Sequence, residues 1–364
     1  MKHLMLLRAG SAKPPVMVFI SLFSALLLTA CGGSSSSTSS APVGGAGGEV
    51  LACAIPPGPT MAVGIEKDCD TSSDPRIRAI SNERIDSTSE LGLGPGRYVM
   101  PGNAEPTQLV VMFHGHQNNS CSWRDHLRAA ADKGAIAVAM DYSEQEDRQT
   151  EQWGFIEDWG WTVRSGAYDS VQAVQYFLDK YPSITEIFNF GTSMGGNISG
   201  FAAYDEFAKK ADCSPIWDYW VATEGVHNLN EEYLAIRSVA PGNESAAIAQ
   251  AEIEEENGGT IEEVPDAYNA ITNTMHAADL SYLKGVVLTH GSNDQTVPVG
   301  QSRQMADQLR VNGVPTHLYV VTGSAHVWEG DGSEPVMRIG LDELFRLMDG
   351  GVVEDGETTV PPSP

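Results

Sequence analysis

Basic residues are scarce in this sequence. Its 364 residues include 22 lysines and arginines against 48 aspartates and glutamates, and the formal net charge at pH 7 is -26. A chain this acidic repels nucleic acid and anionic lipid, so we expect no nucleic-acid partner. Paired metal-ligand spacings of Cys and His, a glycine-rich phosphate loop and internal repeats are also missing. We therefore expect neither a metal ion nor a cofactor.

The apolar run at residues 16–28 is too short for a comfortable membrane span. It follows basic residues and precedes small ones, as in a targeting segment. The letters LTAC at 28–31 resemble the lipobox of bacterial lipoproteins. That resemblance implies a signal peptide at 1–30, lipidation of Cys31 and, because Gly32 follows, anchoring to the outer membrane of an exported protein. The lipid would be the protein's sole contact with the membrane. Residues 31–50, rich in serine and glycine, are predicted to be a flexible tether.

Strands and helices alternate from about residue 107. Continuous apolar runs predict buried strands, and apolar residues at helical spacing predict helices between them. The strands are expected at 109–113, 135–140, 186–190, 217–223, 285–288 and 317–321. The helices are expected at 122–132, 167–178, 302–309 and 338–347, and a further helix after the strand at 186–190 ends at 203. This order predicts a mostly parallel central sheet flanked by helices, in a domain at 51–351. Residues 228–280 are expected to form a cap, or else a disordered loop, and 352–364 a disordered tail.

One serine lies between glycines in the stretch NFGTSMGGNISG at 189–200. A strand that turns sharply into a helix would hold Ser193 in a strained conformation, and side chains at Gly191 and Gly195 would then collide with the backbone. The alternative is a glycine-rich turn that happens to contain serine. The pattern predicts a nucleophile elbow if a base and an acid lie nearby.

Two downstream motifs supply those groups. THGSNDQTVP places Asp294 just after the strand at 285–288, and TGSAHVWEG places His326 just after the last strand. Carboxyl ends of parallel strands share one edge of the sheet, where Ser193 also lies. The residues are those of a Ser-His-Asp relay, in which the base activates the serine and the acid orients the base. Glu224, at the end of the strand at 217–223, is a rival for the acid.

An oxyanion hole needs two backbone N–H groups. The first is expected from Met194, which begins the helix after the serine. The second is expected from His116 in FHGHQNN, after the strand at 109–113. His114 and His290 precede glycines at strand ends and are expected to be structural.

The motifs MFHGH, GTSMGG, HGSNDQTVP and GSAHVW occur in the order typical of the α/β-hydrolase superfamily. The resemblance covers about residues 109–347. The part from 285 to 326 most resembles the hydrolase domains of the prolyl-oligopeptidase and dienelactone-hydrolase groups. It implies an α/β-hydrolase fold and a serine hydrolase that forms an acyl-enzyme. A member that has lost catalysis and only binds, as a surface lipoprotein, is the alternative.

The fold predicted by that resemblance separates two cysteines. Cys121 is expected at the carboxyl edge of the sheet and Cys213 near the opposite edge, too far apart for a disulfide. An even count of four after Cys31 favours disulfides in an exported chain. Cys53 and Cys69 either pair with each other, closing a loop worth roughly 3 kcal/mol, or each pairs with one of the other two.

The expected substrate is a neutral ester, with polymeric esters included. Prolyl-oligopeptidase enzymes carry a propeller ahead of the hydrolase, and the stretch between Cys31 and the first expected strand is too short for one. A carboxylic ester hydrolase is therefore favoured over a peptidase without a propeller. The stretch WGFIEDWGWTV places Trp153, Trp159 and Trp161 before the helix at 167–178, where the rings would flank a substrate or pack beneath the cap.

Overall fold

The computed structural model describes residues 76–80, 96–102, 105–142, 160–207, 209–210, 212–326 and 334–361. They belong to one compact unit, Leu51–Pro364. The predicted signal peptide, the tether, Cys31, Cys53 and Cys69 lie outside the described residues and stay predictions. None of the helices in the described ranges combines the length and apolar character that crossing a membrane requires.

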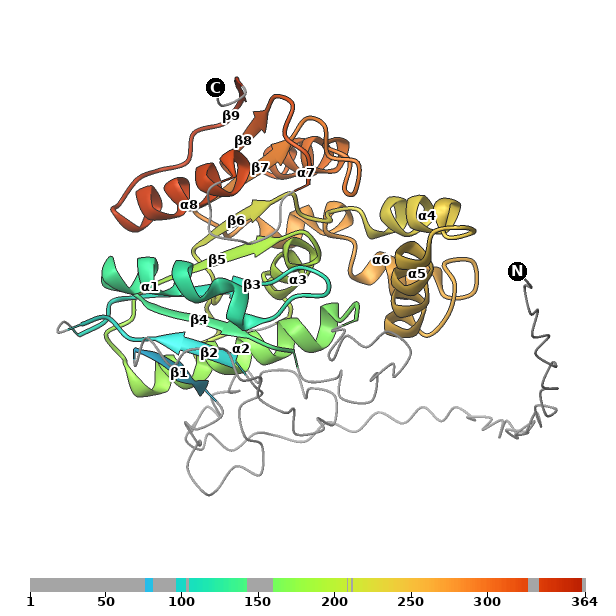
Figure 1. The fold of residues 1–364 in the computed structure, drawn as a ribbon. Coiled ribbons are helices and arrows are strands. Elements are labelled where there is room, and N and C mark those ends of the chain that lie inside the picture. The colour runs from blue at the N-terminus through green and yellow to red at the C-terminus, as the bar shows by residue number, and fades with distance from the viewer. Residues whose placement is uncertain are drawn as a thin grey trace, which may run out of the picture. The chain divides into compact units, whose positions relative to one another are not determined.

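Nine strands of the described chain form one sheet in the order β1-β2-β4-β3-β5-β6-β7-β8-β9 (Figure 1). They are β1 (Ile77–Ala79), β2 (Gly96–Val99), β3 (Gln108–Phe113), β4 (Ile136–Met140), β5 (Glu186–Thr192), β6 (Tyr219–Thr223), β7 (Gly285–Gly291), β8 (Thr316–Val321) and β9 (Gly356–Val360). β2 pairs antiparallel with β1 and β4. All other neighbouring strands are parallel. The predicted α/β-hydrolase architecture is confirmed.

Alternation within the strands divides the core between the two faces of the sheet. In β3, Leu109, Val111 and Phe113 belong to one apolar cluster, whereas Val110 and Met112 belong to the other. Because successive side chains of a strand point to opposite faces, a continuous apolar run requires helices on both sides. This is why β3 and β4 carry scarcely a polar residue.

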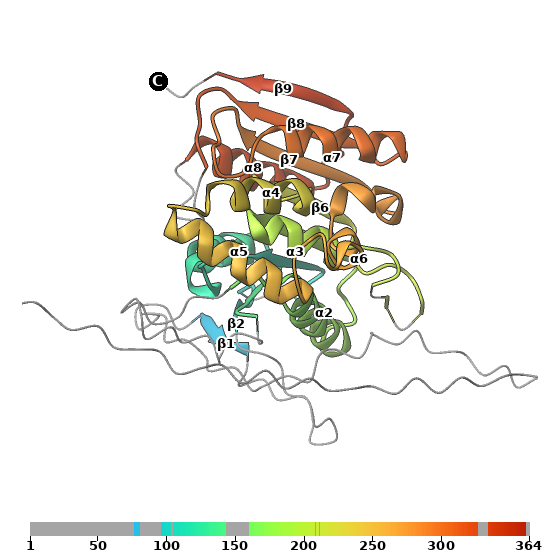
Figure 2. The same ribbon diagram turned by 90° about the vertical axis from the view of Figure 1, so that its right-hand side faces the viewer.

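Helices cover both faces (Figures 1 and 2). α1 (Arg124–Asp132) and α8 (Pro335–Met348) contribute apolar side chains to the cluster that contains Val110. α2 (Val163–Lys180), α3 (Met194–Ala202) and α7 (Gly300–Val311) pack into the other cluster. The helix expected at 122–132 begins as a short 3-10 helix, η2 (Ser120–Trp123).

Between β6 and β7 lies a helical insertion, residues 229–280, where a cap was expected. It comprises α4 (Leu229–Val239), α5 (Glu244–Asn257), α6 (Pro265–Ala270), η4 (Asn273–Met275) and η5 (Ala277–Leu280). The side chains of Asn228 and Asn243 accept hydrogen bonds from the first turns of α4 and α5, and Gly258 ends α5 with φ 81°. The insertion is therefore helical and not a disordered loop.

The prediction of a disordered tail at 352–364 is wrong for its central part. Residues 356–360 form β9, which pairs in parallel with β8 from His317↔Gly356 to Val321↔Val360. The Arg310 guanidinium also donates to the Gly356 carbonyl at 2.6 Å. Backbone pairing at a sheet edge needs no apolar periodicity, so a largely exposed strand left no pattern in the sequence.

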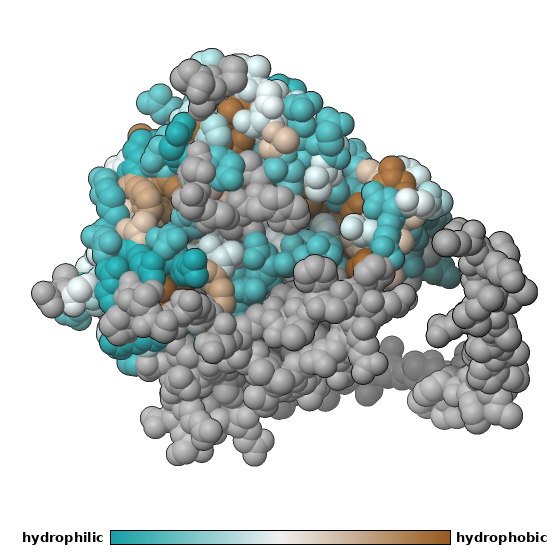
Figure 3. All heavy atoms as spheres, viewed as in Figure 1, coloured by the Kyte–Doolittle hydropathy of each residue, from teal (hydrophilic) through white to brown (hydrophobic). Residues whose placement is uncertain are grey.

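The cysteines expected far apart occupy opposite ends of the sheet. Cys121 lies in η2, after the carboxyl end of β3, and Cys213 precedes the amino end of β6. The disulfide pairing stays a prediction. On the face shown in Figure 3, the surface formed by the described residues is mainly hydrophilic, and its apolar residues lie in small separate groups. The acidic composition leads us to expect this.

Candidate active site

Ser193 occupies the sharp turn between β5 and α3. Its φ of 57° and ψ of -124° are strained for a residue with a side chain. Its N–H donates to the Thr223 carbonyl at 3.1 Å, and its carbonyl accepts from the Val226 N–H at 3.0 Å, which ties the turn to the end of β6. A Cβ at Gly191 or Gly195 would overlap backbone oxygens. The turn therefore has the geometry of a nucleophile elbow.

His326, just beyond β8, lies between the serine and a carboxylate. Its Nε2 is 3.1 Å from Ser193 Oγ, and its Nδ1 is 2.7 Å from Asp294 Oδ2. The imidazole is only 7% exposed. The three side chains predicted to form a relay are thus brought together at the carboxyl edge of the sheet. The arrangement can move a proton from the hydroxyl to the imidazole.

Asp294 is held in its turn by backbone groups. Its Oδ1 accepts the N–H groups of Thr296 at 2.8 Å and Val297 at 2.9 Å. Its Oδ2 also lies 3.3 Å from His290 Nε2. Burial by itself would raise the pKa of Asp294, but hydrogen bonds with His290 and His326 outweigh burial and hold it well below its usual range. The carboxylate is therefore ionised and points at His326.

The pKa of His326 is raised above its ordinary value of 6.5. Burial acts in the opposite direction and is the largest single effect, because a buried imidazolium loses its hydration. The hydrogen bond to Asp294 and the negative charges of Asp294, Glu224 and Glu232 together exceed it. The site favours the protonated imidazole that forms when His326 accepts the serine proton.

Glu224, the rival acid, lies beside the same imidazole. Its Oε2 is 3.5 Å from His326 Nδ1, which is longer than the 2.7 Å from that nitrogen to Asp294. Ligating atoms of Glu224, Asp294 and His326 lie within 4.8 Å of one another, as a metal site would require. Both ring nitrogens of His326, however, already face Ser193 and Asp294. The geometry is that of a proton relay.

The oxyanion hole was predicted to consist of the backbone N–H groups of Met194 and His116. Met194 is the first residue of α3, so its N–H has no partner within that helix. His116 follows β3, and its Nε2 lies 2.6 Å from Glu252 Oε2 on α5. Their role as oxyanion donors stays a prediction.

The helical insertion contacts the elements that carry the site. Glu256 Oε1 accepts from the Arg164 backbone N–H at 3.0 Å, and Arg164 also donates to the Ala267 carbonyl at 2.9 Å. Asn273 Nδ2 donates to the carbonyls of Gly196 and Asn197, both at 3.2 Å, in α3. The insertion is thereby joined to the start of α2 and to the helix that follows Ser193.

The three predicted substrate-binding tryptophans stay predictions. Trp153 and Trp159 lie outside the described residues. Trp161 is 4% exposed, and its ring centroid is 5.7 Å from that of His116. It lies beside the loop after β3 but offers little open surface. This burial favours packing beneath the insertion, and a role in binding substrate stays a prediction.

Sequence reasoning missed a buried polar group next to the relay. Glu232, on α4, accepts a hydrogen bond from Gln301 Nε2 at 2.7 Å. Burial raises the pKa of Glu232 to about 7. His227 is also fully buried, and burial lowers its pKa to about 3. No local sequence pattern predicts the contact between Glu232 and Gln301, because the two residues are about 70 positions apart.

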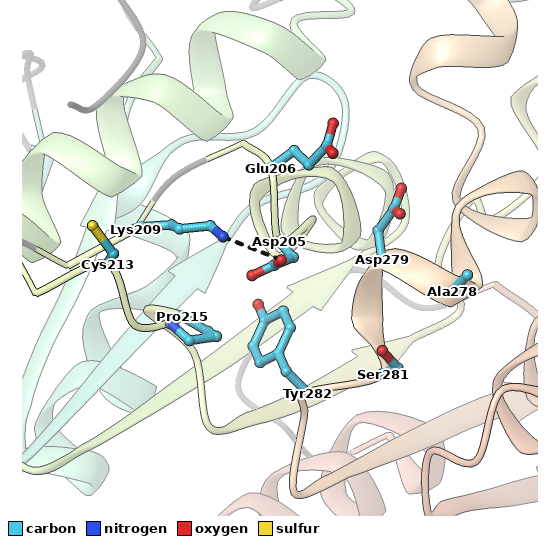
Figure 4. A pocket seen from close by; sticks show the side chains of 9 residues that line it. All are labelled: Asp205, Glu206, Lys209, Cys213, Pro215, Ala278, Asp279, Ser281 and Tyr282. Atoms are coloured by element: carbon cyan, nitrogen blue, oxygen red, sulfur yellow. Dashed lines mark hydrogen bonds and ion pairs between the residues drawn. The ribbon is translucent and has the colours of Figure 1, made fainter. Parts of the chain in front are cut away.

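A cavity of about 430 Å³ lies away from this site, at the opposite edge of the sheet (Figure 4). It is lined by residues that lie between α3 and β6 and by the segment before β7. Within it, Lys209 Nζ lies 3.3 Å from Asp205 Oδ2. Tyr282 donates a hydrogen bond to the Ala203 carbonyl there. None of the relay residues lines this cavity.

Solved structures share the fold at low sequence identity. A puromycin-hydrolyzing peptidase of Mycobacterium tuberculosis is 17% identical with a TM-score of 0.53, covering 79% of this chain and 42% of its own. An acylaminoacyl peptidase bound to a chloromethyl ketone is 18% identical with a TM-score of 0.52, covering 78% and 42%. The propionate-bound esterase Est2 of the planctomycete Thermogutta terrifontis is 16% identical with a TM-score of 0.52, covering 78% and 97%. This chain therefore spans less than half of either peptidase.

Sequence comparison gives the family. No curated protein matches the chain. The model of the prolyl oligopeptidase family matches residues 121–339, which is more than half of the sequence and contains Ser193, Asp294 and His326. The protein belongs to the prolyl oligopeptidase family and is a serine hydrolase.

Proposed function

We propose that the protein is a carboxylic ester hydrolase that works through an acyl-enzyme on Ser193. The observation that carries the proposal is the unbroken pair of hydrogen bonds from Ser193 Oγ to His326 Nε2 (3.1 Å) and from His326 Nδ1 to Asp294 Oδ2 (2.7 Å). Near neutral pH a serine hydroxyl is a poor nucleophile. A base in this position activates it by taking its proton.

Acylation follows from these positions. Ser193 Oγ attacks the acyl carbonyl carbon while His326 Nε2 takes the hydroxyl proton, and Asp294 stabilises the imidazolium that results. The N–H groups of Met194 and His116 receive the oxyanion. His326 then returns the proton to the leaving alcohol oxygen as the ester C–O bond breaks. The acyl group remains on Ser193 and the alcohol departs.

Deacylation repeats the sequence with water. His326 accepts a proton from water as the oxygen attacks the acyl-enzyme carbonyl. The same proton then goes to Ser193 Oγ when the acyl bond breaks. The products are a carboxylic acid and the free enzyme.

Ester chemistry is favoured over peptide chemistry by the demands of the leaving group. An alcohol leaves more readily than an amine, so a serine site hydrolyses an ester with less help. The esterase Est2 is covered over 97% of its length by the matched fold, whereas the two peptidases are covered over 42%. The described residues ahead of β3 supply β1 and β2 of the hydrolase sheet itself. The fold shared with Est2 supports an ester substrate.

Matched substrates test this preference. We would compare p-nitrophenyl esters with p-nitroanilides that carry the same acyl group, and include peptide anilides. Each kcat/KM is divided by the hydroxide rate constant of its substrate, because esters are intrinsically more reactive. The proposal expects the greater enhancement for esters. A greater enhancement for anilides would instead identify a peptidase.

The proposal extends to location and substrate. We place the enzyme at the outer membrane, exported and anchored through lipid on Cys31, where neutral esters too large for import, including polymers, would be accessible. Cys31→Ser should abolish labelling by a radioactive fatty acid, and labelling that persists would reject the anchor. Peptide mapping without reductant would identify which of Cys53, Cys69, Cys121 and Cys213 form disulfides.

A further inference from the structure

We propose that Glu224 is a second carboxylate partner of His326, which stabilises the protonated imidazole by charge while Asp294 holds it by hydrogen bonding. Glu224 is then a positioning residue of the relay and not an alternative to Asp294. The inference rests on the proposed function, because it assigns a role to a neighbour of the proposed base.

The two carboxylates approach the same nitrogen from adjacent strands. Asp294 follows β7 and Glu224 follows β6, so their side chains converge on His326 Nδ1 at 2.7 and 3.5 Å respectively. A separation of 3.5 Å is too long for a good hydrogen bond, whereas a charge acts over several ångströms. Asp294 therefore takes the proton-bearing contact, and Glu224 contributes its charge.

Glu224 occupies a position that is unfavourable for a charged, non-glycine residue. Its side chain is fully buried, and its backbone has φ 49°, in the left-handed region that favours glycine. Burying a carboxylate and holding a non-glycine residue in the left-handed region each make the folded state less stable. Such costs persist where surrounding contacts or a function require them.

Backbone contacts fix the carboxylate. The Gly291 N–H donates to Glu224 Oε1 at 2.9 Å, and the Glu224 N–H donates to the Thr289 carbonyl at 2.8 Å. A Cβ at Gly291 would come within 2.8 Å of Oε1, so the glycine makes room for it. A neutral amide oxygen could accept the Gly291 N–H equally well. The contact therefore explains why the side chain at 224 carries an acceptor oxygen, but it does not explain why that side chain is charged.

The other titratable groups around His326 do not replace that charge. Glu232, on α4, has its pKa raised by burial to about 7, so it is only partly ionised near neutral pH. His290 shares the carboxylate of Asp294, and His227 is held neutral by burial, with its pKa lowered to about 3. At neutral pH, Asp294 and Glu224 are thus the carboxylates that face the imidazole most directly.

The chemical consequence is a division of labour during proton transfer. When His326 takes the serine proton, the new positive charge develops inside a poorly solvated site, where burial opposes it. Two negative charges offset that cost better than one. The same charges keep His326 protonated to higher pH. The pH of the acidic limb of the activity profile should therefore depend on the charge of Glu224.

Glu224→Gln removes the charge and keeps an oxygen for the Gly291 N–H. We expect the acidic limb of kcat/KM to move down by about one pH unit. The control Glu231→Gln removes an exposed carboxylate from the first turn of α4 and should leave the limb in place. A second comparison uses Asp294→Asn, because adding Glu224→Gln to it should lower the residual turnover at least about tenfold more.

An acidic limb that coincides in Glu224→Gln and wild type, with equal turnover in Asp294→Asn and the double variant, would overturn the inference. If Glu224→Gln shows no cooperative thermal transition, Glu224→Asp decides. That variant withdraws the charge by one methylene and should shift the limb in the same direction by a smaller amount, and an unmoved limb would count against the inference. Ser193→Ala separates the two claims, because turnover that survives it refutes the proposed function, whereas its loss without any Glu224 effect refutes only the inference.

Discussion

Glu252 on α5 lies 2.6 Å from Nε2 of His116 in the loop after β3. The contact joins the helical insertion to the loop that is proposed to provide an oxyanion donor. Glu252 is 7% exposed, so the pair is largely shielded from solvent and from screening by salt. The insertion therefore helps to position the loop that carries the His116 backbone N–H.

Glu252→Gln should lower kcat by about tenfold, because a misplaced oxyanion donor weakens transition-state binding by roughly 1 to 2 kcal/mol. KM for a small ester should change less, since the ground-state carbonyl depends less on that donor. Steady-state kinetics and a thermal melt provide the measurements. Glu244→Gln, an exposed change in the first turn of the same helix, is the control. A fall in melting temperature with unchanged kcat would show a structural contact only.

The acidic limb of kcat/KM should lie above pH 6.5. His326 must be neutral to accept the serine proton, and its carboxylate neighbours raise its pKa above 6.5 against the effect of burial. Activity is thus lost as the pH falls through this raised value. Asp294→Asn should move the limb down and reduce turnover by about 10⁴-fold. A limb well below pH 6.5 in the wild type would contradict the charge arrangement.

Glu232→Gln should stabilise the protein at pH 8 relative to pH 5. The folded pKa of Glu232, about 7, exceeds the value of 4.5 expected when unfolded, so folding becomes less favourable as the pH rises between these values. The amide removes that loss, worth about 3 kcal/mol, and still accepts the hydrogen bond from Gln301. Denaturant titrations at both pH values measure the difference. An equal effect at pH 5 and pH 8 would refute the shift.

Neutral esters should be hydrolysed faster than anionic esters of similar size at low salt. The chain carries a formal net charge of -26, which repels an anionic substrate. Added salt should lower KM for the anionic ester and leave the neutral one unchanged, because salt screens charges farther apart than the Debye length of about 8 to 10 Å. Kinetics for both esters at low and high salt provide the measurement. A preference for the anionic ester at low salt would refute the argument.

The sequence predicts those parts of the fold that depend on regular patterns. Buried parallel strands such as β3 have continuous apolar sequences. The parallel direction of β5, β7 and β8 brings their carboxyl ends to one edge of the sheet. That is why Ser193, Asp294 and His326 were expected to meet, and the structure places them within hydrogen-bonding distance.

Long-range contacts of polar groups escape such reasoning. The pairing of Glu252 with His116 spans 136 residues and follows from the packing of α5. β9 was missed because an edge strand can be held by backbone bonds alone. The left-handed backbone of Glu224 also follows from tertiary constraints, since a non-glycine residue seldom adopts it unaided.

A fluorophosphonate probe tests the central claim most directly, because it reacts only with a serine that a neighbouring base activates. Intact mass and peptide mapping should find one adduct on Ser193 in the wild type and none in Ser193→Ala. Labelling should fall sharply in His326→Ala, which lacks the imidazole 3.1 Å from Oγ. Labelling of folded Ser193→Ala at another serine, together with ester turnover in that variant, would contradict the account.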